Sequence, residues 1–491
     1  MGRTTRREFI KSAGAAGAGL WAAHHPALSM LRDAPAGRAK PNVILFVGDD
    51  LGHSELGCYG QEKIRTPNID RLASEGVRFT QFYSGSPVCA PSRCVLMTGM
   101  HSGHAFVRDN KEIQPEGQLP IPSETRILPK LLEDEGYATG AVGKWGLGYP
   151  GSGSEPEKMG FDLFFGYNCQ RHAHNHYPSY LWRNSERVTI EGNDGKSATG
   201  KQYAPDLFER EALAFIRANK SRPFFLFYAT TAPHLALQVP EDSLAEYRGR
   251  WEETPYDGKN GYLPHPTPRA AYAAMVTRFD RSVGRVLGLV KELGLDKDTL
   301  VLFTSDNGST YRIGGYDPEF FQGTRPFRDA KGAIYEGGIR VPLIARWPER
   351  IWPGRTSAHV AAFQDILPTV VEAAGGTGRL PANLDGLSFL PTLLGSGMQV
   401  GHPYLYMEFA GYGGQVMVRM SNWKALRRGL LKNPDAPLEM YDLSIDIGEQ
   451  NNVAREHPEL SRRARVLMKE GHRPSKEFRI PALDGGGDPG L

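Results

Sequence analysis

The chain is poor in cysteine and has no long apolar run. Its 491 residues include four cysteines, at positions 58, 89, 94 and 169, and no two of them form a Cys-x-x-Cys pair. This spacing argues against a structural zinc site. No segment reaches the roughly 20 apolar residues that a membrane-spanning helix needs, so we expect no stable membrane span.

Charge of one sign is also scarce beyond the first residues. The formal net charge is +3, and residues 1–36 carry five basic and two acidic side chains, which accounts for all of it. The rest of the chain is therefore neutral. Nucleic-acid-binding proteins display a basic patch or stripe, so we expect no nucleic-acid partner.

The first residues are typical of an export signal. Arg6 and Arg7 precede a Gly/Ala-rich stretch at residues 12–23, and a twin arginine before a mildly apolar segment indicates export by the Tat machinery. We predict a Tat-type signal over residues 1–37, cleaved between Ala27 and Gly37, and hence a periplasmic or extracellular protein. The alternative is a disordered basic tail.

Apolar runs of strand length alternate with helical patterns over most of the chain. We predict strands at 42–47, 137–142, 223–228 and 299–304, and helices at 128–135 and 270–293. The longer helix carries apolar residues at steps of three and four, which is one face of a helix. Strands that alternate with helices favour an α/β fold, a large mixed and mostly parallel sheet sandwiched by helices.

The pattern changes near residue 395. Short strands are predicted at 404–409, 415–420, 424–428 and 438–443, followed by a helix at 458–470. This order is typical of a smaller antiparallel sheet with one helix. We therefore predict a main domain at 38–398, a small C-terminal α+β domain at 399–484, and a disordered tail at 485–491.

Polar side chains cluster just past the predicted strands. Sites in open α/β sheets form at the carboxyl ends of the strands. Six residues fit that rule: Asp49, Asp50, Lys144, His234, Asp306 and Asn307. We expect their side chains to line one cleft.

Four of these side chains are hard oxygen donors, which suit calcium or magnesium rather than zinc or copper. They are Asp49, Asp50, Asp306 and Asn307. The two adjacent aspartates reach one site only if the chain turns there, which the glycines on either side of the pair would allow. The alternative for each motif alone is a plain turn, since Asp, Asn and Gly favour turns.

The segment after residue 88 carries the most specific signal. Residues 89–93 read Cys-Ala-Pro-Ser-Arg, and Leu96, Thr98 and Gly99 follow. A lone cysteine is more often a buried small hydrophobe than a nucleophile. This pattern, however, resembles the signature of the type I sulfatases, in the arylsulfatase A-like branch of the alkaline phosphatase superfamily. In that family a formylglycine-generating enzyme oxidises the cysteine to formylglycine, and the hydrate of this aldehyde attacks sulfur.

The resemblance implies a role for each of the clustered residues. One divalent cation, calcium with magnesium as the alternative, would be held by Asp49, Asp50, Asp306, Asn307 and the modified Cys89. The side chains facing the sulfate ester would be Arg93, Lys144, His234 and Lys331, with His234 or Lys331 assisting the leaving oxygen. A helix predicted to start near Ser92 would place Cys89 at its N-terminal end, where backbone donors favour an anion.

One position departs from the family pattern. Many sulfatases read Gly-Lys-Trp-His-Leu-Gly, in which the histidine contacts the aldehyde hydrate, whereas this chain has Gly146 at that place. Histidines lie further along at 172, 174 and 176, and an extended segment would put all three on one side. We predict that His174, or else His172, reaches the vacant place. The alternatives are a surface cluster or a substrate subsite.

Two further features stay open in the sequence. A disulfide between Cys58 and Cys169 is compatible with an exported protein, but the spacing does not decide it. Arg108 and Asn110 lie in a segment that resembles the arylsulfatase A-like branch, so they are candidates for the substrate mouth. A solvated loop is the alternative for this second pair.

The match to the family extends from residue 42 to about residue 452. It predicts an enzyme that hydrolyses sulfate monoesters of carbohydrates or aryl alcohols. One alternative is a phosphate or phosphonate monoester hydrolase of the same superfamily, although no second set of metal ligands is visible. The other is an exported carbohydrate-binding homologue without activity, which the intact set of catalytic residue types argues against.

Overall fold

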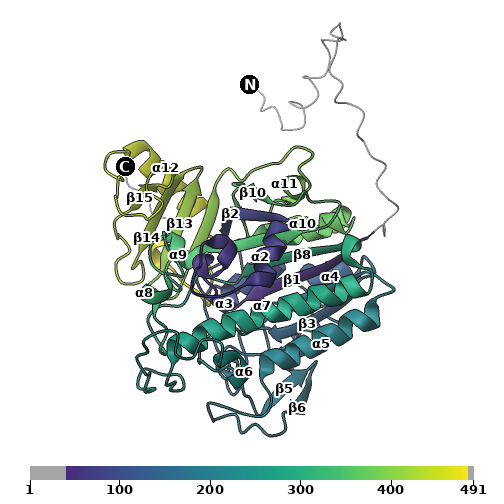
Figure 1. Ribbon diagram of the computed structural model, residues 1–491. Helices are drawn as coiled ribbons and strands as arrows, with labels where there is room; N and C mark the ends of the chain where they lie inside the picture. Colours follow the sequence, from purple (N-terminus) through teal and green to yellow (C-terminus); the bar gives the residue numbers. More distant parts are fainter. Residues whose placement is uncertain (1–39, 485–491) are drawn as a thin grey trace, which may run out of the picture. The chain divides into compact units, whose positions relative to one another are not determined.

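The computed structural model describes residues 40–484, so the predicted signal segment 1–37 and the predicted tail 485–491 lie outside the described residues. An eleven-stranded sheet and a four-stranded sheet form the frame of this range (Figure 1). Within it, no helix combines the length and the apolar character of a membrane span.

Five parallel strands form the centre of the large sheet, in the order β8-β1-β7-β3-β4. They are β1 (Asn42–Gly48), β3 (Ala138–Lys144), β4 (Leu163–Tyr167), β7 (Phe224–Ala229) and β8 (Thr299–Ser305). Four of them confirm predicted strands to within one or two residues at either end. The fifth, β4, is a strand that the sequence did not predict.

Antiparallel strands extend this sheet on both sides. On one side β9 (Arg340–Arg346) pairs with β8 and with β2 (Val77–Tyr83), and short strands β10 (Arg355–Ser357) and β11 (Ala361–Ala362) lie parallel to β2. On the other side β5 (Tyr180–Arg183) pairs with β4 and with β6 (Glu186–Thr189). The prediction of a mixed, mostly parallel sheet is therefore confirmed.

Helices cover both faces of the large sheet, and strand β1 shows why the sequence reads as continuously apolar. Its residues Val43, Leu45 and Val47 belong to one buried core, and Ile44 and Phe46 belong to the other, because successive side chains point to opposite faces. The first core includes helices α3 (Cys89–Thr98), α4 (Leu128–Glu133) and α10 (Ile366–Ala373). The second includes α2 (Pro67–Ser74), α5 (Ala204–Asn219) and α7 (Pro268–Glu292) (Figure 1).

The small sheet confirms the antiparallel strands predicted beyond residue 399. Its order is β12 (Leu405–Phe409), β13 (Gln415–Met420), β14 (Trp423–Arg428) and β15 (Glu439–Asp442), and α12 (Pro458–Glu470) follows. Val418 of β13 belongs to the same apolar core as Val43 of β1. The two sheets thus share a core, and the domain boundary at residue 398 stays a prediction.

Short helices and turns complete the described chain. The short α-helices are α6 (Glu241–Leu244), α8 (Pro318–Phe321), α9 (Glu336–Ile339), α11 (Leu390–Leu394) and α13 (Pro481–Asp484). The 3-10 turns are η1 (His53–Glu55), η2 (Gly57–Tyr59), η3 (His172–His174), η4 (Asp296–Asp298), η5 (Phe363–Asp365) and η6 (Thr377–Arg379).

The structure decides the disulfide that the sequence left open, because all four cysteines are free. Cys58 lies in η2, whose neighbour Tyr59 bonds to the backbone of β2 and β9, whereas Cys169 follows β4 on the other side of the central strands. The separation of these two strand groups in the sheet keeps the sulfurs apart.

Candidate active site

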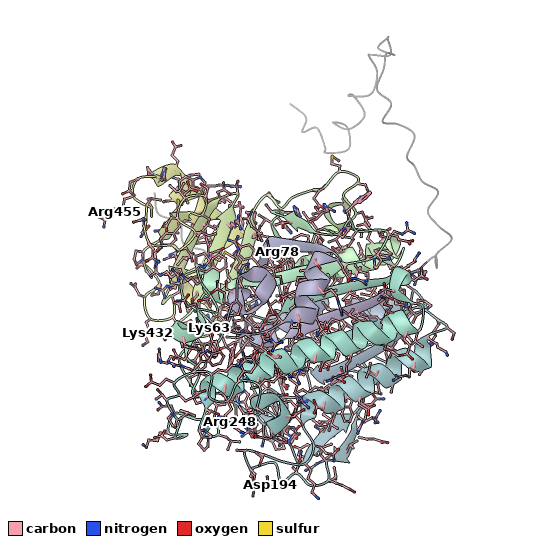
Figure 2. All side chains as sticks on the ribbon, in the orientation of Figure 1. Lys63, Arg78, Asp194, Arg248, Lys432 and Arg455 are labelled. Atoms are coloured by element: carbon pink, nitrogen blue, oxygen red, sulfur yellow. The ribbon has the colours of Figure 1, made fainter. Side chains whose placement is uncertain are left out.

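The predicted residues gather at the carboxyl edge of the large sheet. Asp49 and Asp50 follow β1, Lys144 ends β3, His234 follows β7, and Asp306 and Asn307 follow β8. All six side chains are buried, as are Cys89 and Arg93 of α3. Charged side chains on the outside of the fold, such as Asp194, Arg248 and Lys432, are exposed, and Figure 2 shows Asp194 and Lys432 at the margin of the molecule. Burying a charged side chain is costly unless it is paired, so the buried charges at this edge of the sheet need partners or a function.

The turn after β1 aims both aspartates at one place. Asp50 has φ of 61°, in the left-handed region, and it rather than a glycine makes the turn. Gly52 has φ of −68°, and Gly48 is a regular residue of β1. The sequence therefore predicted the turn correctly but assigned it to the wrong residues.

Four candidate ligand atoms converge beneath this turn. One atom each of Asp49, Asp50, Cys89 and His234 lies within 4.8 Å of the others. Asp306 adjoins them, since its Oδ1 accepts a hydrogen bond from the backbone N–H of Asp50 at 3.1 Å. The structure thus brings the predicted carboxylates together and adds His234 to the group.

Asn307 completes the oxygen set. Its Nδ2 donates to Asp50 Oδ1 at 2.8 Å, and its Oδ1 is buried without a hydrogen-bond partner. A buried acceptor without a partner is costly unless a ligand, an ion or water meets it. Together with the carboxylates, this oxygen fits a hard divalent cation.

Each carboxylate in the cluster has a cation beside it. Lys144 Nζ lies 2.7 Å from Asp49 Oδ2, and Lys331 Nζ lies 2.8 Å from Asp50 Oδ2. Arg93 donates to Asp306 Oδ2 through Nη2 at 2.8 Å and through Nε at 3.2 Å. Three positive and three negative side chains therefore balance one another within this buried edge.

Burial and neighbouring charges shift the ionisation of these groups. Burial alone would raise the pKa of Asp49, but the charges of Lys144, His234 and Arg93 outweigh it and hold that pKa well below its usual range. Burial and the charge of Asp49 raise the pKa of Asp306 to about 6. Burial opposes the charge of Lys331, but Asp50 and Cys89 outweigh it, so its pKa is well above the ordinary value.

Cys89 is the first residue of α3, which begins three residues earlier than the sequence predicted. Its Sγ lies 3.6 Å from Asp49 Oδ1, and burial raises the pKa of the thiol to about 12. The side chain is therefore a neutral thiol at physiological pH. The N-terminal position is as expected, and Asn110 caps it, because its Oδ1 accepts the N–H of Ala90 at 2.9 Å.

His234 has a defined tautomer. Its Nδ1 lies 2.6 Å from the carbonyl oxygen of Leu235, so the ring proton sits on Nδ1, and Nε2 is an acceptor. Lys331 Nζ lies 3.2 Å from that Nε2. The lysine is therefore the member of this pair that carries protons toward the site.

The three histidines after residue 171 go to three different places, because the segment forms the turn η3 and is not extended. The His174 ring stacks on that of His234, with centroids 4.7 Å apart, and so belongs to the site. His172 turns away, with Nδ1 3.1 Å from Glu116 Oε1. His176 bonds to the carbonyl oxygen of His234 at 2.9 Å, which supports the backbone of the site.

The prediction that His174 or His172 fills the place opened by Gly146 is not what the structure shows. A Cβ atom added to Gly146 would lie 2.2 Å from Gln170 Nε2 and 3.9 Å from Arg93 Cδ. Gln170 comes from the loop after β4, a strand that the sequence did not reveal. The one sequence feature that could have identified Gln170 is its position just past a strand end. Because β4 was not predicted, this feature was missed.

The two candidates for the substrate mouth separate. Asn110 is exposed next to Cys89, as expected of a residue at the mouth. Arg108 is buried, and its Nη1 pairs with Glu408 Oε1 at 2.6 Å and donates to the carbonyl oxygen of Arg473 at 2.7 Å. It is therefore a structural residue beneath the small sheet, neither at the mouth nor in a solvated loop.

Comparisons with known proteins agree with this geometry. The family model described as Sulfatase matches residues 41–376, and the model described as N-sulphoglucosamine sulphohydrolase, C-terminal, matches residues 327–470. The chain is 33% identical over 484 residues to N-acetylgalactosamine-6-sulfatase of Rattus norvegicus, covering 92% of this chain and 84% of the relative. It is 28% identical over 511 residues to N-acetylgalactosamine-6-O-sulfatase of Bacteroides thetaiotaomicron, covering 88% and 93%. The solved structure of Ps i-CgsB in complex with k-i-k-neocarrahexaose is 28% identical, with a TM-score of 0.73 and coverage of 90% and 94%.

Proposed function

Since the chain belongs to the sulfatase family, we propose that it hydrolyses sulfate monoesters with a formylglycine formed from Cys89 and one divalent cation. The observation that carries this proposal is the convergence of Cys89 with Asp49 and Asp50 within 4.8 Å. Lysines 144 and 331 flank the same place, each bonded to one of the two carboxylates. A nucleophile precursor, metal ligands and cations for an anionic ester are thus in one buried site.

The donor set supports a hard cation, calcium with magnesium as the alternative. Asp49, Asp50, Asp306 and Asn307 would hold it, and the unpartnered Oδ1 of Asn307 is the acceptor that such an ion would satisfy. Bound there, the ion would supply Lewis-acid stabilisation of the negative charge on the ester.

The raised pKa of Cys89 supports the need for oxidation. A thiol with a pKa of about 12 offers almost no thiolate at neutral pH, so the unmodified side chain is a poor nucleophile. Oxidised by a formylglycine-generating enzyme, position 89 would supply an aldehyde hydrate as the nucleophile for covalent catalysis. Arg93, one helical turn further on, donates Nη1 to the carbonyl oxygen of Lys144 at 2.6 Å and so positions that lysine.

Lys331 is the proton donor to the departing alcohol in this proposal. His234 Nε2 accepts a hydrogen bond from Lys331 Nζ at 3.2 Å, so the histidine orients the ammonium group and does not itself carry the transferred proton. The proton leaves Lys331 Nζ for the bridging oxygen as the S–O bond breaks. The ring of His174 stacks on that of His234 and so stands beside the pair that handles this proton.

We further propose a sulfated carbohydrate as the substrate and the periplasm or cell exterior as the location. The relatives from Rattus norvegicus and Bacteroides thetaiotaomicron are both named for N-acetylgalactosamine-6-sulfate chemistry. The twin arginine at Arg6 and Arg7 supports Tat export. Maturation would then need two partners, the oxidising enzyme and the Tat machinery.

The test compares protein produced with and without a formylglycine-generating enzyme. We expect the mass of the Cys89 peptide to show the aldehyde only in the first, and only that protein to hydrolyse an aryl sulfate and a sulfated N-acetylgalactosamine. An aryl phosphate of the same alcohol should react more slowly. Aldehyde-bearing protein that hydrolyses no sulfate ester contradicts the proposal, and faster turnover of the phosphate would favour the phosphatase alternative.

A further inference from the structure

The loop after β4 contains buried polar side chains that have no hydrogen-bond partner in the protein. Asn168 and Gln170 are 1% and 6% exposed. In both side chains the amide nitrogen and the amide oxygen lack a hydrogen-bond partner. Among residues 40–484, no other side chain has two buried polar atoms that both lack a hydrogen-bond partner. Such a group in a native fold usually has a functional reason.

This loop lies against the part of the site that surrounds Cys89. The backbone N–H of Gly146 donates to the carbonyl oxygen of Asn168 at 3.1 Å. The Cβ position of residue 146 is 2.2 Å from Gln170 Nε2 and 3.9 Å from Arg93 Cδ. Arg93 follows Cys89 by one helical turn on α3, so both side chains lie on the same face of that helix. The carboxamide of Gln170 therefore lies beside Gly146 and close to Arg93, whose side chain belongs to the site.

Gly146 is suited to this arrangement by its backbone. Its φ is 78°, in the left-handed region, where a residue with a Cβ is strained. A side chain at 146 would also collide with Gln170. Gly146 and Gln170 therefore depend on each other, because Gln170 occupies the space that a side chain at 146 would need.

A purely structural glutamine in the same neighbourhood looks different. Gln238 is as buried as Gln170, but its Oε1 accepts the N–H of His176 at 2.8 Å and its Nε2 donates to the carbonyl oxygen of Ala198 at 3.1 Å. Both ends of that amide support the fold. The two ends of Gln170 support nothing within the described protein, although desolvating them is costly.

We propose that Gln170 is a substrate-contacting residue whose Nε2 donates a hydrogen bond to the anionic group held at residue 89. The inference rests on the proposed sulfate ester hydrolysis and adds one residue to that site. A carboxamide can donate and accept hydrogen bonds but is neither an acid nor a base near neutral pH. Gln170 therefore orients and stabilises the ester, and proton transfer is left to Lys331, which His234 orients.

The central variant is Gln170→Met, which keeps the length of the side chain and removes its polar atoms. Because those atoms have no protein partner, Tm should stay equal or rise. The value of kcat/KM on a sulfate ester should fall about ten- to a hundred-fold, the loss expected for one hydrogen bond to a charged group. Inhibition by inorganic sulfate should weaken in parallel, which a merely space-filling role would not cause.

Gln170→Glu and Gln238→Met sharpen this result. The first keeps the shape but places a negative charge beside the anion, so its inhibition by inorganic sulfate should be weaker than that of Gln170→Met. The second removes an amide with partners at both ends, so its Tm should fall where that of Gln170→Met does not.

The outcomes separate this inference from the proposed function. Wild-type protein bearing the aldehyde but inactive on every sulfate ester overturns both. Active wild type with an equally active Gln170→Met overturns only the role of Gln170. A Tm of Gln170→Met that falls as far as that of Gln238→Met also overturns it, because the amide would then have structural partners.

Discussion

The active-site cluster and a second buried cluster between the two sheets contain the same kinds of charge but satisfy them differently. The active-site cluster consists of Asp49, Asp50, Asp306, Arg93, Lys144 and Lys331. The second, here called the inter-sheet cluster, consists of Tyr83, Glu336, Arg340, Arg419, Lys424 and Glu449. It joins β2 and β9 of the large sheet to β13 and β14 of the small one.

In the inter-sheet cluster, cations and hydrogen-bond donors of the protein surround the carboxylates. One oxygen of Glu336 accepts from Tyr83 at 2.7 Å and pairs with Arg340 at 3.0 Å, and the other pairs with Lys424 at 2.9 Å. Lys424 also pairs with Glu449 at 2.8 Å. Burial alone would raise the pKa of Glu336, but Lys424 and Arg340 outweigh it and hold that pKa at about 2. Each carboxylate of this cluster therefore has a cation beside it, although Glu449 Oε1 meets Lys424 only as an ion pair and has no hydrogen-bond partner.

The active-site cluster is balanced in charge but incomplete in hydrogen bonding. Asn307 Oδ1 has no partner, and four ligand atoms from Asp49, Asp50, Cys89 and His234 point at one another within 4.8 Å. The two carboxylates among these groups, Asp49 and Asp50, repel each other unless a cation lies beside or between them. The comparison teaches that neither a buried charge nor a single unmet acceptor marks a functional site, whereas ligand atoms that converge on one point do.

Removal of Cys89, the proposed nucleophile precursor, should give the largest effect and tests the active-site half of the comparison. Cys89→Ala should lower turnover of a sulfate ester by about 10⁴-fold or more, the scale of losing a nucleophile. The fold should be kept, since Sγ makes only a weak hydrogen bond to Asp49 Oδ1 at 3.6 Å and alanine removes a single atom. Cys94→Ala, in the same helix, is the control and should keep turnover. Residual turnover in Cys89→Ala near the wild-type level would show that residue 89 is not the nucleophile.

The two buried lysines test the comparison most directly. Lys424→Met leaves Glu336 and Glu449 without their shared cation and should destabilise the protein by about 3–5 kcal/mol, as removal of one partner from a buried pair does. Lys144→Met should also lower Tm, because Asp49 loses its ion pair. Calcium should restore Tm in Lys144→Met but not in Lys424→Met, measured by thermal unfolding with and without chelator. Equal rescue of both variants would remove the distinction between the clusters.

Lowering the pH should weaken the contribution of the inter-sheet cluster to the stability of the fold. The pKa of Glu336 is lowered from 4.5 to about 2, so its ion pairs stabilise the fold above pH 4.5, and this contribution disappears as the pH falls toward 2. Urea unfolding of wild type and Glu336→Gln across this range should show a stability difference that is full above pH 4.5 and shrinks below it. A difference that does not change with pH would mean that hydrogen bonding, and not charge, holds this cluster.

Substitution of His174 and of His172 should give the smallest difference in activity among these tests. His174→Ala should lower kcat by about 10²-fold, the lower range for a group that assists proton transfer. His172→Ala should leave kcat nearly unchanged and cost about 1 kcal/mol of stability, since it removes a hydrogen bond to Glu116. Kinetics and thermal unfolding of both variants check this. The reverse pattern would place His172, rather than His174, in the site.

Local patterns were enough to predict much of this site. Continuous apolar runs predicted β1 and β8, and the polar residues past their ends predicted Asp49 and Asp306 at one edge. That prediction succeeds because parallel strands must end at a common edge, so the order of residues along the chain already implies their meeting. The small antiparallel sheet was likewise predictable from its short alternating strands.

Other residues were misread because their environment depends on distant parts of the chain. Arg108 is 300 positions from its partner Glu408, and nothing near Arg108 indicates that the small sheet covers it. His172 and His174 lie two positions apart in η3, which is about two thirds of a 3-10 turn, so one side chain reaches Glu116 and the other His234. Spacing along the chain describes direction only after the backbone conformation is known.

The amino-acid sequence by itself determined the α/β architecture, the strand-end acids and the motif around Cys89, because hydrophobic period and motif spacing are local properties of a chain. Only the tertiary structure decided which group lies beside Gly146 and which buried polar atoms have hydrogen-bond partners. Gln170 meets that position across two loops, and whether a buried atom has a partner depends on every segment packed around it.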